Sequence, residues 1–433
     1  MKVLSLAWKY HPSITSGVGV ACEGLNNALS KIVDLTVIYP KVSKIQVKEE
    51  IVLSSEDLSE EQRKIIEQEY IKVVEEGKYE IAVRFDPYFT LFQSKKKNKG
   101  KPKSSNETKT HVLGHKTTEK ILYDDVDVFD EYVRDKIFLY NRLVEELTSH
   151  LEFDIIHAHD WMTFLAGISL KNKFNKPLIL HVHSLEYDRV GHKDASWVYD
   201  IERFAMSKAD YVISTSNYTK GIIESNYGLS GNHITTIYNA VSVPEYKHDG
   251  NGGKEKHFKV LFAGRIDGNK GIEYFIEIAR KVLKKSKEVK FIVAGRGLGN
   301  VKFEKIKGFN EISSKLTYLG FIEREKLFEL FSVCDVLCMP SISEPFGLTA
   351  IEAAYVGLPV ILSTKTGASE VLLRTPKADF WDTDKFADHI LSIKENPKVR
   401  KKIVENNKMD VSNLSWDSSA STVLSLYKKL LGR

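Results

Sequence analysis

The chain has 433 residues, of which 42% are hydrophobic and 28% charged, and its formal net charge is +5. These values exclude a disordered chain and predict a globular protein of two domains, while so small a charge excess argues against a nucleic-acid-binding role. No stretch approaches the roughly 18 consecutive apolar residues of a membrane-spanning helix, and the few cysteines do not form a disulfide framework, so we expect a protein of the reducing cytoplasm.

The first half of the chain alternates short apolar segments with segments of helical periodicity. The N-terminal segment has one early lysine and a short apolar run without a cleavage site, which predicts a strand and not a secretion signal. Strands are expected at residues 2–7, 35–39, 80–85, 154–158, 177–183, 211–215 and 234–237, and helices at 17–33 and 130–150. This alternation predicts a parallel sheet with helices on both faces.

Residues 94–110 form a lysine-rich segment, with seven lysines and one acid. One interpretation is a solvated loop that has no binding role. The other is a basic lid over an anionic substrate, or a peripheral contact with a membrane surface. The sequence leaves both interpretations open.

The second half repeats the alternation after a break. Residues 244–257 have linker composition, with a proline, three glycines and no apolar periodicity. Strands are then expected at 258–263, 290–294, 316–320, 336–339 and 359–363, and helices at 271–285, 325–332, 348–356 and 418–431. The fold class is therefore α/β, with two Rossmann-like, doubly wound parallel-sheet domains facing a cleft. We place the domains at residues 1–245 and 256–412, followed by a C-terminal helical segment at 413–433.

The strongest motif is SEPFGLTAIE at residues 343–352, between a predicted strand and a predicted helix. The backbone amides at a helix start have no partners within the helix, so with the helix dipole they form a site suited to phosphate. Glu344 precedes the helix and is able to reach past such a phosphate. Glu352 lies inside the helix, where a carboxylate can bind ribose hydroxyls.

The second motif, GRIDGNKG at residues 264–271, also follows a strand and opens a helix. Arg265 and Lys270 place two cations on one turn. Two cations with helix amides can neutralise the charge that develops on a diphosphate leaving group. A basic surface turn is the alternative interpretation.

Two histidine clusters and a glycine pair follow strands in the first half. The clusters are HAHDW at residues 157–161 and HVHSLEYDR at 181–189, and Gly17 and Gly19 lie in a turn before the first helix. Neutral imidazoles are hydrogen-bond partners for sugar hydroxyls or phosphate oxygens, and glycines let a ligand approach the backbone. Histidine and aspartate are also common zinc ligands, so a metal site built on the two clusters stays an alternative.

Taken together and in order, these motifs resemble glycosyltransferase family 4, a group of retaining GT-B enzymes that includes sucrose synthases, and the related glycogen synthases. The resemblance covers nearly the whole chain. Ser16 stands where the family usually has the first glycine of a pair, and residues 14–16 lack the lysine found there in glycogen synthases, whereas the HAHDW segment favours that branch.

The resemblance implies a role for each motif residue. Arg265 and Lys270 match the cations that hold the donor diphosphate, and Glu344 matches the acid that contacts the donor sugar. His159 matches a histidine that faces the transferred sugar. The remaining donor-binding positions that it implies are Gly17, Gly19, His183, Phe346, Gly347, Leu348, Thr349 and Glu352, and it implies that the C-terminal helix crosses back onto the first domain.

The function expected from this resemblance is retaining transfer of a hexosyl group, with glucosyl favoured, from a nucleotide-sugar such as UDP- or ADP-glucose. No metal and no other cofactor is expected, because the two cations balance the diphosphate. The acceptor is open between an α-glucan, a sugar phosphate, a lipid and another small glycoside. A metal-dependent hydrolase that uses the histidine clusters is the alternative from another class.

Overall fold

We describe the chain from a computed structural model. The residues that it describes are 1–8, 17–40, 51–53, 61, 133–190, 196–242, 257–266, 268–296 and 305–433. The strand expected at 80–85 and the lysine-rich segment at 94–110 lie outside these residues, as does Ser16.

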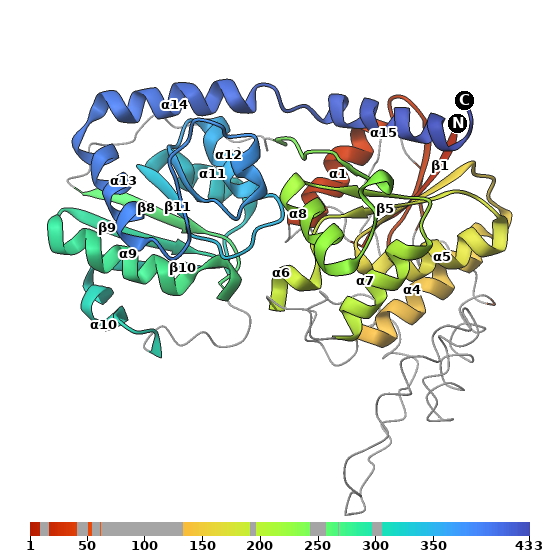
Figure 1. Cartoon of the computed structure of the whole chain (residues 1–433), viewed down its shortest axis with the longest axis horizontal. Helices are drawn as coiled ribbons and strands as arrows, with labels where there is room; N and C mark the ends of the chain where they lie inside the picture. The colour runs from red at the N-terminus through yellow and green to blue at the C-terminus, as the bar shows by residue number, and fades with distance from the viewer. Residues whose placement is uncertain are drawn as a thin grey trace, which may run out of the picture. The chain divides into compact units, whose positions relative to one another are not determined.

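Two β-sheets organise the described residues (Figure 1). The first has the strand order β3-β2-β1-β4-β5-β6-β7, and the second has the order β10-β9-β8-β11-β12-β13. Neighbours such as β1 and β2, or β8 and β11, pair in parallel. The strands of the first sheet are β1 (Lys2–Leu6), β2 (Asp34–Ile38), β3 (Ile51–Leu53), β4 (Ile155–His159), β5 (Leu178–Val182), β6 (Tyr211–Ser214) and β7 (Ile234–Thr236). Those of the second are β8 (Phe258–Ala263), β9 (Val289–Ala294), β10 (Leu316–Gly320), β11 (Val336–Met339), β12 (Val360–Ser363) and β13 (Lys377–Ala378).

Helices connect the strands, as parallel pairing requires. The helices up to β7 are α1 (Gly17–Leu29), α4 (Val133–Leu147), α5 (Trp161–Phe174), α6 (Glu186–Val190), α7 (Trp197–Lys208) and α8 (Asn217–Ile222). Those after β8 are α9 (Ile272–Lys285), α10 (Phe309–Ile312), α11 (Arg324–Val333), α12 (Leu348–Val356), α13 (Thr383–Glu395), α14 (Pro397–Val411) and α15 (Trp416–Leu430). Single turns include η8 (Gly268–Lys270) and η11 (Gly367–Glu370).

By contacts between Cα atoms, the chain divides into two compact units. The first comprises Met1–Pro12 and Val33–Leu178, and the second comprises Ser13–Ile32 and Ile179–Arg433. This division differs from the domain bounds expected at residues 245 and 412, which stay a prediction. In the first unit, the buried Tyr140 of α4 donates its hydroxyl to the carbonyl oxygens of Ala7 and Ile38, so the helix is joined to the ends of β1 and β2.

The second sheet, which lies in the second unit, is covered on both faces. Alternate residues of β8 enter two different cores. Val260 and Phe262 pack in one core with residues of α9 and α13, and Leu261 and Ala263 pack in the other with residues of α11 and α12. Side chains alternate across a strand, so helices on both faces give the doubly wound arrangement that the sequence predicts.

The C-terminal helix α15 packs against α1, and both belong to the second unit (Figure 1). A Cβ added to Gly24 of α1 would lie 2.4 Å from a ring carbon of Trp416, so the absence of a side chain lets the indole pack against the helix. The indole Nε1 of Trp416 donates to Ser242 Oγ at 2.8 Å. An exposed ion pair joins Lys31 to Asp417.

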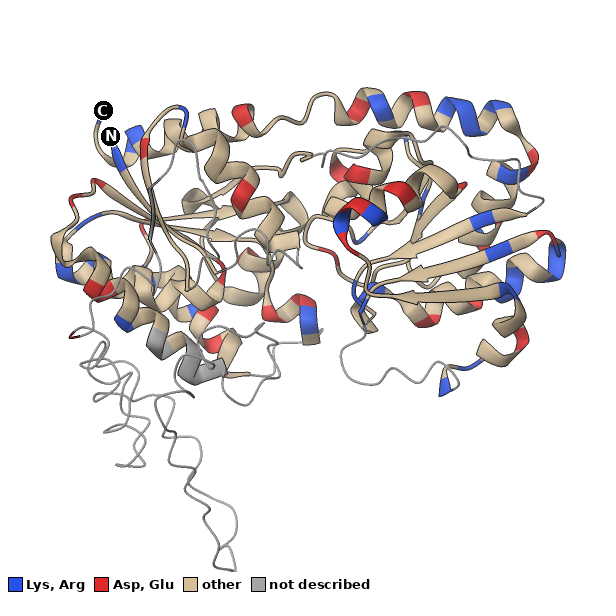
Figure 2. Ribbon diagram, turned by 180° about the vertical axis from the view of Figure 1, so that it is seen from behind, with Lys and Arg blue, Asp and Glu red and all other residues tan. Residues whose placement is uncertain are grey.

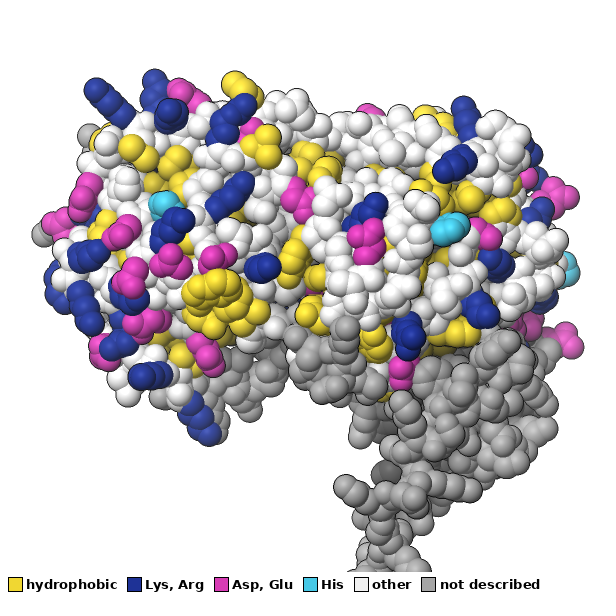
Figure 3. All heavy atoms as spheres, in the orientation of Figure 1, with side chains coloured by type: hydrophobic (Ala, Val, Ile, Leu, Met, Phe, Trp, Pro, Cys, Tyr) yellow, Lys and Arg dark blue, Asp and Glu magenta, His cyan; other side chains and the backbone are white. Residues whose placement is uncertain are grey.

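Charged residues lie mostly on helices and near strand ends (Figure 2). The face drawn in Figure 3 carries Lys, Arg, Asp and Glu interspersed with hydrophobic side chains. Among the described residues, no helix is both long and apolar enough to span a membrane.

Candidate active site

The second unit brings together Lys270 and Glu344, which the sequence predicts in one donor site. Lys270 closes the turn η8 that follows β8, and Glu344 lies in the loop that follows β11, the strand beside β8. The Lys270 Nζ and a Glu344 carboxylate oxygen form an ion pair, with side chains 17% and 11% exposed. A cation and a carboxylate therefore meet at the carboxyl edge of the sheet, where ligands bind in open α/β sheets.

Gly271 explains why these two loops approach so closely. Its φ of +76° lies in the left-handed region, and a Cβ there would lie 2.0 Å from the carbonyl oxygen of Pro340. The amide of Ile342 also donates to the carbonyl oxygen of Asn269 at 2.8 Å. A glycine after Lys270 is thus required by both the backbone conformation and the neighbouring loop.

Helix α12 begins in the same loop as Glu344. Gly347 is its N-cap residue, with φ of 96°, and Leu348 and Thr349 form its first turn. Phe346 is buried and joins the core beneath. A Cβ added to Gly17 would lie 3.7 Å from Leu348 Cδ1, so the start of α1 is close to the start of α12. Gly17 and Gly19 lie within α1 and not in a turn before it, because the helix already begins at Gly17. The first amides of α12 have no acceptors within the helix and offer an anion site.

Glu352 is buried in α12 and already has a cationic partner. Arg324, at the start of α11, donates from Nη2 to Oε1 of Glu352 and to the carbonyl oxygen of Ser242. Burial raises the pKa of Glu352, and the Arg324 guanidinium acts in the opposite direction. Arg324 is a residue that our sequence analysis missed, because no motif marks the first turn of α11.

Arg265, the other predicted cation, follows β8 by two residues and is exposed. It lies on the same strand–helix connection as Lys270. The connection thus places two cations after one strand, as the motif indicates.

His157 and His159 lie in the first unit, at the carboxyl end of β4 and before α5. Their ring centroids are 4.3 Å apart and the rings stack, so the two side chains share one face of the strand. The next residue, Asp160, has φ of 61° and ψ of 165°, a conformation that non-glycine residues rarely adopt. Strained backbone of this kind concentrates at functional sites, and the role of the HAHDW segment in such a site stays a prediction.

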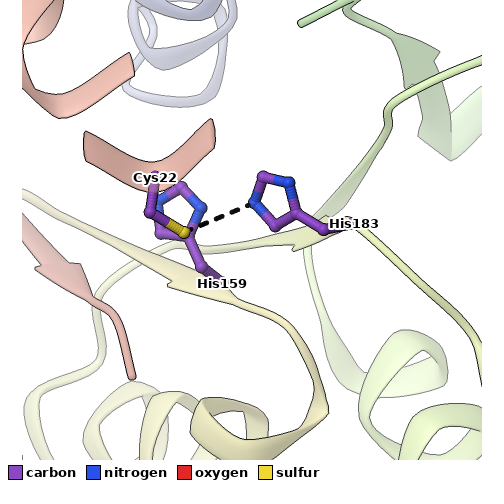
Figure 4. Close-up of side chains that lie close together, drawn as sticks. All are labelled: Cys22, His159 and His183. Carbon is purple, nitrogen blue, oxygen red and sulfur yellow. Dashed lines mark hydrogen bonds between the residues drawn. The ribbon is translucent and has the colours of Figure 1, made fainter. Parts of the chain in front are cut away.

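His181 and His183 form a similar stacked pair in the second unit, with centroids 4.3 Å apart. The thiol of Cys22 in α1 lies 3.7 Å from Nε2 of His183 (Figure 4). Gly19, also predicted in the site, is buried in the same helix. Burial lowers the pKa of His183 to about 3, so its ring is neutral at physiological pH. A neutral imidazole can exchange hydrogen bonds with a sugar hydroxyl.

Cys22 and His183 also belong to one group of potential metal ligands. Thiolate and imidazole both bind zinc, so this part of the chain has the chemistry that the metal-dependent alternative requires. A measurement of bound metal therefore tests that alternative directly.

Two family models and several known proteins match this chain. A family model described as the starch synthase catalytic domain matches residues 2–230, and one described as glycosyl transferases group 1 matches residues 245–410. An uncharacterized glycosyltransferase of Methanocaldococcus jannaschii is 29% identical over 310 residues, covering 65% of this chain and 77% of that protein. A glycogen synthase of Mycobacterium tuberculosis is 24% identical over 224 residues, covering 51% and 54%.

Solved structures share the fold. The sucrose-phosphate synthase from Thermosynechococcus elongatus superposes with a TM-score of 0.70 at 17% identity, over 100% of this chain and 99% of that one. The Anabaena protein HepE, in complex with UDP and glucose, gives 0.64 at 14% identity, over 99% and 100%. The matches over both halves establish that this chain belongs to the group 1 glycosyltransferases, with an N-terminal half of the starch synthase catalytic type, and that it is a glycosyltransferase of the GT-B fold.

Proposed function

We propose that this glycosyltransferase transfers a hexosyl group, with glucosyl favoured, from a nucleotide-sugar to an acceptor hydroxyl with retention of configuration. The observation that carries the proposal is the Lys270–Glu344 ion pair, which joins the turn η8 to the loop that opens α12. A cation, a carboxylate and free helix amides are the groups that a donor with a diphosphate and a hydroxylated sugar needs.

The diphosphate is the part of the donor that gains charge as the sugar leaves. In the proposal, Lys270 and Arg265 contact it together with the amides at Gly347 and Leu348. Groups fixed before the reaction stabilise this developing charge without reorganisation. Because protein cations balance the diphosphate, the proposal includes no metal ion.

In this proposal, Glu344 and Glu352 bind the other two parts of the donor, which are the sugar and the ribose. Glu344 accepts hydrogen bonds from the sugar hydroxyls, and Glu352 accepts them from the ribose. Both carboxylates have cationic partners in the structure, so the donor exchanges contacts with Lys270 and Arg324 when it binds.

Retention follows, in the proposal, from attack on the face that the diphosphate leaves. The acceptor oxygen forms the new bond to the anomeric carbon as the bond from that carbon to the phosphate oxygen breaks. The acceptor proton passes to the departing phosphate oxygen, so the step needs no separate protein base. His159 and His183 are then hydrogen-bonding groups that orient the transferred sugar, with Gly17 and Gly19 lining its surroundings.

An α-glucan is the first acceptor to test. The family model of the N-terminal half is named for starch synthases, and a glycogen synthase is among the relatives of this chain. Trehalose-6-phosphate synthase and sucrose-phosphate synthase are among the structural neighbours, so sugar phosphates follow as the second class of acceptor. Lipid acceptors form the third class.

The test is a panel of UDP-, ADP- and GDP-sugars assayed with EDTA present. Release of nucleoside diphosphate is followed with and without maltooligosaccharide, and the anomeric configuration of any product is determined by NMR. Elemental analysis of the purified protein is made in parallel.

Release that rises with maltooligosaccharide and yields an α-linked product would support the glucan acceptor. Release that is the same with and without maltooligosaccharide would support the donor assignment, and sugar phosphates and lipids would be the next acceptors to test. An inverted product would refute retention. Stoichiometric zinc, with activity lost in EDTA, would favour the metal-dependent alternative.

A further inference from the structure

Ser343, the residue before Glu344, is bound by side chains from α6 and α8. Its Oγ donates to Oδ1 of Asp188 at 2.6 Å, and the hydroxyl of Tyr218 lies 2.9 Å from the same Oγ. With the Ser343 proton directed at the carboxylate, Tyr218 is the donor to Ser343. The three groups then form one directed chain from Tyr218 through Ser343 to Asp188.

Pro345, the residue after Glu344, is held in a similar way. Its carbonyl oxygen accepts from Ser216 Oγ at 2.6 Å and from Thr219 Oγ1 at 3.3 Å. Both hydroxyls come from the start of α8. The loop that carries Glu344 is therefore fixed on each side of that residue.

Helix α6 also holds the loop that carries Lys270. The side-chain amide of Asn269, the residue before Lys270, donates to the carbonyl oxygen of Arg189. Arg189 directly follows Asp188. Two consecutive residues of one helix thus bind the neighbours of both partners in the Lys270–Glu344 pair.

A helix of five residues cannot hold other loops unless it is itself anchored. The anchor is Glu202 of α7, which is fully buried. Its carboxylate pairs with Nη2 of Arg189 at 2.9 Å, accepts from the amide of Glu186 at 2.9 Å, and accepts from the hydroxyl of Tyr227 at 2.6 Å. With this many hydrogen bonds to one buried carboxylate, α6 has a defined position.

We propose that Asp188 and Ser343 are positioning residues, which hold Glu344 in register with Lys270 so that both meet the donor. The inference rests on the proposed function of that pair. Neither residue contacts the donor in this account, and each acts through the backbone of the Glu344 loop. A shift of about 1 Å in a catalytic group can cost about 100-fold in rate, so the loss of one buried hydrogen bond here has a measurable effect.

The test is a double-mutant cycle between Ser343→Ala and Glu344→Gln, measured as single-turnover release of nucleoside diphosphate from the best donor. Ser343→Ala should lower the rate at least about tenfold in the wild type, because Glu344 loses its register. In the Glu344→Gln background the same change should cost less than about twofold, since the group that it positions is already removed. Ser343→Thr, which keeps the hydroxyl, should recover most of the loss, and Ser332→Ala on the exposed end of α11 is the matched control.

A second readout separates positioning from a general structural role. A nucleoside diphosphate lacks the sugar that Glu344 contacts in the proposal, so its Kd by calorimetry should change less than about threefold in Ser343→Ala. Asp188→Ala, which removes the acceptor of the Ser343 hydroxyl, should follow Ser343→Ala in both measurements. If Asp188→Ala does not fold, the double-mutant cycle with Ser343→Ala is the deciding test.

Equal rate losses from Ser343→Ala in both backgrounds would overturn the inference while leaving the proposed function intact. A loss of nucleoside diphosphate binding as large as the loss in rate would also overturn it. Failure of the wild type to release nucleoside diphosphate from any donor would instead refute the proposed function, and with it the inference.

Discussion

Polar side chains differ in their pairing and burial between two regions of the molecule. One region is the loops after β8 and β11, which we call the donor loops, and the other is the histidine pairs at the ends of β4 and β5. In the loops, each predicted carboxylate is paired with a cation, and the Lys270–Glu344 pair is partly exposed. In the histidine pairs, the rings are buried and stacked, and His183 is neutral. The first region holds carboxylates of low exposure that are paired with cations, and the second holds buried rings that can form hydrogen bonds.

This difference indicates which part of a substrate each region is suited to bind. The cation of such a pair can exchange its carboxylate for the charged oxygens of a diphosphate, and the carboxylate can accept hydrogen bonds from hydroxyl groups. Buried rings make hydrogen bonds of fixed direction to uncharged hydroxyls. A diphosphate therefore suits the loops, and a sugar ring suits the histidines.

Removal of the loop charges is the largest expected effect. Lys270→Ala and Glu344→Ala should each lower turnover at least about 100-fold, because each removes a group proposed to contact the donor in the transition state. Nucleoside diphosphate release measures the loss, and circular dichroism checks the fold. Lys290→Ala, an exposed lysine on β9, is the matched control and should keep turnover within about twofold. Near-wild-type turnover in Lys270→Ala or Glu344→Ala would withdraw that residue from the site.

Variants of two glycines in one turn test how closely the loops that carry Lys270 and Glu344 approach each other. Gly271→Ala should lower the free energy of unfolding by about 3 kcal/mol, since the new Cβ meets the Pro340 carbonyl and the positive φ is strained. Gly268→Ala, with open space around its Cβ, should change that free energy by less than about 0.5 kcal/mol. Urea denaturation of both variants makes the comparison, and equal values for the two would contradict the structure of this turn.

The neutral state of His183 predicts a pH dependence of stability. Its pKa falls from an ordinary 6.5 to about 3 on folding, so the unfolded chain binds the proton first. The stabilising contribution is complete above pH 6.5 and is lost progressively as the pH falls toward 3. Between pH 7 and pH 5 the wild type should lose about 2 kcal/mol more than His183→Gln, which does not titrate. Parallel loss in the two proteins would show that the ring titrates normally in the folded chain.

The packing of α15 on α1 can be tested through the stability of the fold. Gly24→Ala should cost about 2 kcal/mol, because the methyl group overlaps the ring of Trp416. Gly221→Ala in α8 has open space around its Cβ and should be neutral or stabilising by up to about 1 kcal/mol. Thermal unfolding of the two variants measures the difference, and a neutral Gly24→Ala would contradict the helix contact.

Much of the fold could be predicted, because buried parallel strands are continuous apolar segments with turns at both ends. The bounds expected for β8, β10, β11 and α12 coincide with the structure. The last helix starts two residues earlier than expected, at Trp416, whose indole packs on α1. The expected elements do not include α13, α14 or β3; β3 has only three residues, and the apolar spacing of α14 is weak.

The sequence by itself determined the order of the motifs, their places at strand ends and the chemical types they carry, because these follow from local pattern. Only the tertiary structure decided which groups pair. Lys270 and Glu344 are 74 residues apart, and Asp188 and Ser343 are 155 apart. Such residues meet only when the strand order places their loops together, and no local pattern encodes that order. Burial likewise set the pKa of His183, since it depends on how much protein surrounds the ring once the chain is folded.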